Sequence, residues 1–238
     1  MYKNYVFDLY GTLVDIRTNE NKSYLWKKMH LWYAMHDASY NKPLSLKKEF
    51  FKLVSQYEKD MNYDDAEIQI EYVFKELFEA KGVHASIELA IETGKMFRML
   101  ALEHINLYDG VLELFDKLKK AGKNIYLLSN AQRIFTEPEM RYLGIYDKFD
   151  GIIYSSDAGY KKPSATFFEE LFEEYELEKS ESVMIGNDHI CDAKGASDFG
   201  IDSLYWYTSI SPAHPGKKNL PKGCKEIKNI KDVAKTIK

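Results

Sequence analysis

Short apolar runs alternate with stretches of helical periodicity along most of the second half of the chain. Strands separated by helices of this length favour a parallel sheet with right-handed crossovers. Residues 1–14 add a first strand followed by a turn. The pattern therefore predicts a doubly wound, Rossmann-like α/β fold, with later strands at 125–128, 152–154, 183–185 and 204–207 and helices at about 109–121, 134–143, 164–176 and 190–199.

A block of helical periodicity interrupts this pattern just after the first strand. From about Asn19 to Ile105 no convincing strand appears, and four helices are expected near 19–38, 45–61, 64–81 and 86–104. The block begins seven residues past Asp8, which favours a lid that excludes water and selects substrates over a purely structural domain. The predicted division is core at 1–14, an α-helical cap at 15–105 and core again at 106–238.

Composition narrows the class of protein. The chain has 238 residues, 45% of them hydrophobic, which is enough for a substantial core. A net charge of −4 gives no support for nucleic-acid binding, and no apolar run is long enough to span a bilayer. The first residues run straight into the first strand, and Cys191 and Cys224 are too few for a disulfide framework. These features predict a cytoplasmic protein with no nucleic-acid or membrane partner, and they leave the oligomeric state open.

The strongest chemical signal is Asp8, which ends an apolar run and is followed closely by Gly11 and Thr12. In open α/β sheets, ligands bind at the carboxyl ends of the strands, so this carboxylate is a candidate for contact with a substrate. The alternative is an aspartate that only starts a turn.

Two further segments carry polar groups at the same edge. Ser129 and Asn130 end the apolar run that begins at Ile125, and the hydroxyl of Ser129 can donate to an anionic oxygen. Lys162 precedes Pro163 just ahead of a predicted helix, where it can hold a positive charge over a site. Each segment also has an ordinary interpretation as a turn.

A fourth segment ends the run at 183–185 with a cluster of oxygen ligands, namely Asn187, Asp188 and, one helical turn later, Asp192. Mg²⁺ prefers such hard oxygen ligands and keeps several waters. The alternative is that the two acids interact with the dipole of the helix that they open.

Taken together, the four segments resemble the motifs of the haloacid dehalogenase (HAD) superfamily of hydrolases, in order, spacing and position of the insert. The resemblance implies that Asp8 is a nucleophile, and that Thr12 and Ser129 contact the transferred group or orient Asp8. It implies that Lys162 neutralises the intermediate and, with Ser129 and Asn130, binds the substrate. The implied Mg²⁺ ligands are Asp8, the Tyr10 carbonyl, Asn187, Asp188 and Asp192.

Tyr10 departs from the phosphatases of this superfamily, which carry an acid–base aspartate at that position. A phenol is a poor replacement near neutral pH. The first motif is instead similar to that of the 2-haloacid dehalogenases, which displace halide and need no proton. That second resemblance is incomplete, because no arginine lies between Thr18 and Asp64 and Phe168 stands where a tyrosine is expected.

These features leave three hypotheses. A Mg²⁺-dependent phosphatase acting on a small, anionic phosphorylated metabolite is favoured over a metal-independent 2-haloacid dehalogenase. A non-catalytic descendant that binds a phosphorylated ligand or a protein is the third, and an intact Asp8 and Lys162 count against it. The aromatic residues of the helical block fit its own core better than a substrate surface; they include Trp26, Trp32, Tyr33 and Tyr40.

Overall fold

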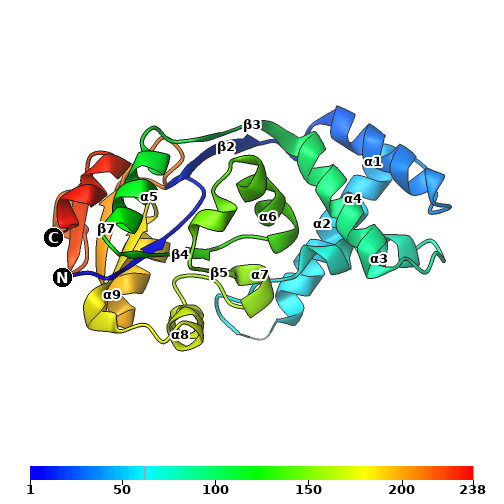
Figure 1. Ribbon diagram of the computed structural model, residues 1–238. Coiled ribbons are helices and arrows are strands. Elements are labelled where there is room, and N and C mark those ends of the chain that lie inside the picture. Colours follow the sequence, from blue (N-terminus) through cyan, green and yellow to red (C-terminus); the bar gives the residue numbers. More distant parts are fainter. Residues whose placement is uncertain (62, 238) are drawn as a thin grey trace.

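The computed structural model describes residues 1–61 and 63–237. Its centre is a six-stranded parallel sheet in the order β5-β4-β1-β6-β7-β8. Helices cover both faces of this sheet (Figure 1). The doubly wound α/β prediction is therefore confirmed, and the strands are β1 (Asn4–Phe7), β4 (Asn124–Ser129), β5 (Gly151–Tyr154), β6 (Ser182–Gly186), β7 (Asp202–Trp206) and β8 (Cys224–Ile227).

The register of the three central strands sets the position of the site. Phe7 of β1 lies opposite Leu127 of β4 on one side and Ile185 of β6 on the other. The three strands are parallel, so their carboxyl ends lie at the same edge. Asp8 and Asn187, which follow β1 and β6, and Ser129, the last residue of β4, are thereby brought to one edge of the sheet.

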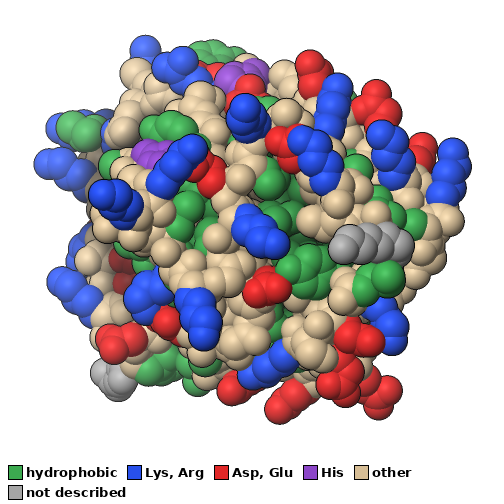
Figure 2. All heavy atoms as spheres, turned by 90° about the vertical axis from the view of Figure 1, so that its left-hand side faces the viewer, with side chains coloured by type: hydrophobic (Ala, Val, Ile, Leu, Met, Phe, Trp, Pro, Cys, Tyr) green, Lys and Arg blue, Asp and Glu red, His purple; other side chains and the backbone are tan. Residues whose placement is uncertain are grey.

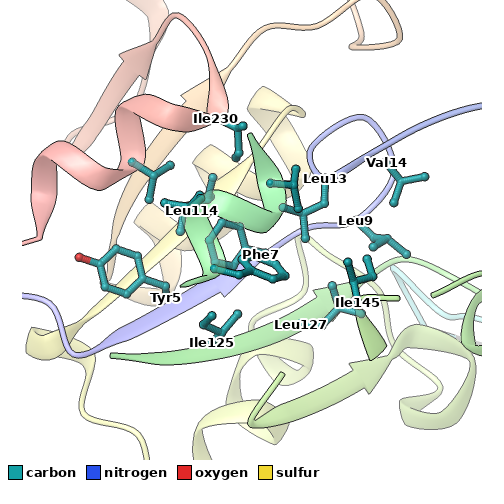
Figure 3. Packing of buried hydrophobic residues seen from close by; sticks show 14 of the residues in the cluster. Tyr5, Phe7, Leu9, Leu13, Val14, Leu114, Ile125, Leu127, Ile145 and Ile230 are labelled. Carbon is teal, nitrogen blue, oxygen red and sulfur yellow. The ribbon is translucent and has the colours of Figure 1, made fainter. Parts of the chain in front are cut away.

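Alternation along β1 divides the core between the two faces of the sheet. Tyr5 and Phe7 point to one face, where they pack with α5 (Val111–Lys120), α6 (Arg133–Tyr142) and the 3₁₀ turn Ile230–Thr236 (Figure 3). Val6 points to the other face, against α8 (Ala165–Glu174) and α9 (Gly195–Phe199). All three β1 side chains are fully buried, which holds the strand that leads to Asp8 firmly in place.

The inserted block forms a second hydrophobic cluster, to which Ile134 of α6 also contributes. It consists of α1 (Ser23–Met35), α2 (Pro43–Asp60), α3 (Ile70–Glu79) and α4 (Ile87–Ala101), which lie on the right in Figure 1. Trp26, Tyr33 and Tyr40 are buried in this cluster, and the hydroxyls of the two tyrosines donate to backbone carbonyls. Trp32 is partly buried against the cluster and donates to Thr93. These aromatic side chains build the core of the helical block.

The connection between the block and the sheet is a strand pair that the hydrophobic pattern does not reveal. β2 (Val14–Thr18) and β3 (Leu102–Leu107) pair antiparallel and lead into and out of the helices (Figure 1). The expectation of a helix to 104 is wrong at its end, because α4 stops at Ala101 and β3 follows. β2 and β3 expose charged side chains such as Arg17 and Glu103, so they lack the apolar alternation of a buried strand.

One further element differs from expectation. The predicted helix at 190–199 is a π-helical turn, His189–Lys194, followed by the short α9. The lysine-rich C-terminal segment contributes the edge strand β8 and 3₁₀ turns. Figure 2 shows positive and negative side chains interspersed on the face where this segment lies. Within the described residues, no helix combines the length and the apolar character needed to cross a membrane.

Candidate active site

A buried lysine joins two carboxylates at the carboxyl edge of the sheet. The ammonium of Lys162 lies 2.8 Å from Oδ1 of Asp8 and 2.7 Å from Oδ1 of Asp192. Burial alone would lower the pKa of Lys162, but the two carboxylates outweigh it and raise that pKa above its ordinary value. Burial also raises the pKa of Asp192, and the ammonium opposes that shift. The lysine is therefore a fixed positive charge beside Asp8.

The backbone of Lys162 is held from two directions. Its N–H donates to Oδ1 of Asn130 at 2.7 Å, and its carbonyl accepts from Nδ2 of Asn130 at 2.9 Å. The preceding N–H, of Lys161, donates to the carbonyl of Asp65 in the helical block at 2.8 Å. Asn130 therefore positions the lysine loop, and the helical block is attached to the same loop.

Thr12 connects Asp8 to the fourth motif. Its Oγ1 lies 3.0 Å from Oδ2 of Asp8 and 3.2 Å from Oδ1 of Asn187. Nδ2 of Asn187 donates to Ser211 at 3.1 Å, which orients the amide oxygen toward Thr12. Gly11 has a φ of +87°, and a Cβ there would lie 2.3 Å from Asn187. A glycine is required at this turn for both reasons.

The two aspartates of the fourth motif have different environments. Oδ1 of Asp188 accepts from the N–H groups of Ile190 and Cys191, so Asp188 caps the π-helical turn. Asp192 uses one oxygen for Lys162 and the other for the N–H of Asp188, at 2.9 Å. Asp192 is thus a positioning partner of the lysine, with both of its oxygens already engaged.

A cavity of about 230 Å³ brings these groups together. Ser129 lines it, and among the described residues its buried hydroxyl has no hydrogen-bond partner. A buried hydroxyl without a partner costs free energy unless a ligand or water satisfies it. The Ser129 hydroxyl is therefore available to a substrate oxygen, and the lining consists of Asp8, Tyr10, Ser129, Asn130, Lys162, Asn187, Asp188, Cys191, Asp192, Ile210 and Pro212.

The donor set near Asp8 suits Mg²⁺ in its chemistry. No group of three or more His, Cys, Asp or Glu side chains that could hold a metal gathers within residues 1–61 and 63–237. Mg²⁺ does not need such a group, because it is commonly held by one or two carboxylates with waters completing the shell. Asp8 and Asp188 supply two carboxylates on one cavity, while the Asn187 amide and the Tyr10 carbonyl are further hard oxygens.

The side chain of Tyr10 is committed elsewhere. Its hydroxyl donates to Oε2 of Glu139 at 2.5 Å and lies 3.0 Å from Oγ1 of Thr136. Burial, and then the negative charge of Glu139, raise the pKa of Tyr10 far above its ordinary value. The Tyr10 phenol is consequently unsuited to be an acid or a base near neutral pH.

A second cavity of about 370 Å³ adjoins the first and shares Tyr10 and Asn130 with it. It lies between the helical block and the sheet domain, since its walls include Arg98 of α4 and Phe135 of α6. Sequence reasoning missed these residues, because nothing in their local spacing marks them. The lining is Tyr10, Ile16, Thr18, Glu20, Glu67, Arg98, Asn130, Ala131, Gln132, Phe135 and Thr136.

Comparison with known proteins identifies the class to which this site belongs. Residues 2–200 match the model of the haloacid dehalogenase-like hydrolases, so the chain belongs to this family of hydrolases. The family assignment made from the four motifs is confirmed.

Individual relatives are distant. The chain is 25% identical over 115 residues to a ribulose-1,5-bisphosphate 5-phosphatase of Halopiger xanaduensis; the match covers 48% of each chain, so it spans about half the length of that relative. Among solved structures, a 2-haloacid dehalogenase from Pseudomonas syringae aligns with a TM-score of 0.65 and 19% identity, over 99% of this chain and 97% of that one. The putative HAD-hydrolase YfnB of Bacillus subtilis, in a structure bound to magnesium, aligns with a TM-score of 0.57 and 19% identity. That alignment covers 99% of this chain and 98% of YfnB. At such identities the two structures show a shared fold.

Proposed function

We propose that this protein is a Mg²⁺-dependent phosphatase that acts on a small phosphorylated metabolite through a covalent intermediate on Asp8. The observation that carries the proposal is the buried Lys162–Asp8 contact of 2.8 Å beside the unpartnered hydroxyl of Ser129. A fixed cation and a free donor next to a carboxylate suit a tetrahedral anion in that cavity. The phosphatase named among the relatives supports the same reaction class.

The reaction divides into two displacements. Asp8 attacks phosphorus, the bond to the ester oxygen breaks, and the leaving alkoxide takes a proton from solvent water. A second water then attacks the phosphoryl group and loses a proton to solvent, the bond between phosphorus and Asp8 breaks, and inorganic phosphate leaves with the Asp8 carboxylate regenerated. Lys162 stabilises the negative charge of both transition states, while Ser129 donates to a phosphoryl oxygen and Thr12 orients the carboxylate. Bound Mg²⁺ would be held by Asp8, Asp188 and the Tyr10 carbonyl with Asn187 beside them, and would neutralise phosphoryl charge.

The helical block α1–α4 acts in this proposal as the cap over the cavity, with the core at 1–14 and 106–238. Segment 63–69 of the cap is tied to the lysine loop, as the bond from Glu67 N–H to the Gly159 carbonyl illustrates. Gln132, two residues past Asn130, donates to the Ile68 carbonyl and to Glu67. Closure of the cap and placement of Lys162 are therefore expected to be coupled.

Dehalogenation of 2-haloacids is the second candidate, and the environment of Tyr10 favours it. A displaced halide needs no proton, so the lack of an acid at this position would not slow that reaction. Lys162 and Asp192 would serve unchanged, whereas Mg²⁺ would not be required. Asp188 counts against this candidate, because a second carboxylate beside Asp8 repels an anionic haloacid.

One screen separates the candidates. Purified protein is supplied with a panel of phosphate monoesters and of 2-haloacids, with and without Mg²⁺, and both phosphate and halide are measured. We expect phosphate release that requires Mg²⁺. Halide release that survives chelation would replace the proposal with dehalogenation, and no release of either product would remove both.

A further inference from the structure

The cavity beside the catalytic centre is where the remainder of a phosphate ester would lie. It shares Tyr10 and Asn130 with the cavity of Asp8, so an ester whose phosphoryl group contacts Lys162 extends past these two residues into it. This step rests on the proposed phosphatase function. The charges on the wall of the second cavity then decide which alcohols are accepted.

The one cation on that wall within the described residues is already neutralised. Arg98 donates from Nε to Oε1 of Glu139 at 2.6 Å and from Nη2 to Oε2 at 3.3 Å. Both side chains are largely buried, 16% and 11% exposed, so solvent screens the pair little. Arg98 therefore contributes almost no net positive charge toward a ligand in the cavity.

Two carboxylates on the same wall have no such partner. Within residues 1–61 and 63–237, no ion pair of 4 Å or less involves Glu20 or Glu67. Glu67 accepts from Gln132 at 3.0 Å and from Ser155 at 3.1 Å, and both of these donors are neutral. Burial raises the pKa of each glutamate. Arg98 opposes the shift at Glu20, while the hydrogen bond from Ser155 and then the charge of Lys161, which does not line this cavity, oppose it at Glu67. The cavity wall thus carries an excess of negative charge.

We infer that the leaving group of the substrate is a small neutral polyol, and that Glu20 and Glu67 exclude esters bearing a second phosphate or a carboxylate. Carboxylate oxygens accept hydrogen bonds from hydroxyl groups, and Thr18 and Thr136 add hydroxyls to the same wall. A second anion there would meet like charge at short range. The substrate class therefore differs from that of the bisphosphate 5-phosphatase among the relatives.

The test compares esters that differ in one charged group. Glycerol 3-phosphate is paired with 3-phosphoglycerate, and ribulose 5-phosphate with ribulose 1,5-bisphosphate, and kcat/KM is measured with saturating Mg²⁺. In each pair, we expect kcat/KM to be higher by about tenfold or more for the ester whose leaving group is uncharged. A tenfold ratio equals about 1.4 kcal/mol. E20Q is expected to narrow that ratio by roughly threefold to tenfold. E92Q, the same change on an exposed part of α4, leaves the ratio unchanged.

Two results would overturn the inference. One is a higher kcat/KM for the esters with a second anionic group, and the other is a kcat/KM ratio that neither E20Q nor the second variant, E67Q, changes. Binding supplies a readout that does not depend on turnover. In calorimetry with the Asp8→Asn protein, the ester with the uncharged leaving group should have the lower Kd in each pair. If no ester is hydrolysed by the parent protein, the phosphatase proposal fails, while the ratio of these Kd values still tests the charge of the cavity.

Discussion

The hydroxyl of Tyr10 donates to Oε2 of Glu139 over 2.5 Å, and the same carboxylate binds Arg98 of the helical block. The residue that stands where a phosphatase would carry its acid–base carboxylate is thereby fixed to helix α6. The guanidinium of Arg98 also lies 5.5 Å from the centre of the Tyr10 ring. Tyr10 thus forms part of the contact between the helical block and the core.

Restoring a carboxyl at this position should accelerate a phosphatase. The side chain in Tyr10→Asp is too short to reach Glu139, so it stays near Asp8 as an acid of suitable pKa. We expect the rate of phosphate release from alkyl esters to rise by about tenfold to a hundredfold, which reaches only the lower end of the roughly hundredfold to ten-thousandfold effect of a placed acid. Nitrophenyl phosphate should gain least, because its leaving group needs little protonation.

Tyr10→Asn is the matched control for that change, since it has the same size but no ionisable group. Equal rates for the two variants would show that the gain comes from loss of the phenol and not from acid catalysis. In a dehalogenase, Tyr10→Asp should instead lower halide release, because a new negative charge repels the haloacid. Measuring both products with both variants therefore distinguishes the two reactions.

Asp8→Asn should abolish turnover and leave the fold intact. The amide is a poor nucleophile, so a loss of more than about a thousandfold is expected. Asp192 still neutralises Lys162 in this variant, and the melting temperature should change by no more than a few degrees. Asp15→Asn, the same substitution on half-exposed β2, should keep full activity. Retention of substantial activity by Asp8→Asn would exclude a covalent intermediate on that residue.

The sequence pattern was sufficient to predict five of the six strands and the convergence of their polar ends, because both follow from hydrophobic periodicity and from parallel topology. The edge strand β8 was not predicted. The strand pair β2–β3 was not predictable from hydrophobicity, because its charged side chains are exposed to solvent and the two strands lack apolar alternation. Arg98 and Glu139 lie 41 residues apart in the chain, on α4 and α6, and no local pattern specifies such a contact. The bonds from Asn130 to the lysine loop were missed for the same reason.

Lys162→Met should be both inactive and unstable. It leaves Asp8 and Asp192 buried without a cation, and removal of one partner from a buried ion pair costs about 3–5 kcal/mol. Adding Asp192→Asn removes one of the stranded charges, so the double variant should regain part of the free energy of unfolding, measured in urea, with no return of activity. A double variant no more stable than Lys162→Met, or an active Lys162→Met, would contradict the role given to Lys162.

Chelation should stop phosphate release, and added Mg²⁺ should restore it. Asp188 provides the sharper test, because one of its oxygens caps the π-helical turn and its charge is available to a metal. Asparagine is as good a cap as aspartate, so Asp188→Asn should leave the melting temperature nearly unchanged. The Mg²⁺ concentration needed for half-maximal activity should rise by about tenfold or more, since one of two carboxylate ligands is lost.

Asp188→Ala removes cap and ligand together and should also lower stability by about 1 kcal/mol. An unchanged Mg²⁺ requirement in Asp188→Asn would remove this residue from the metal site and confine it to capping.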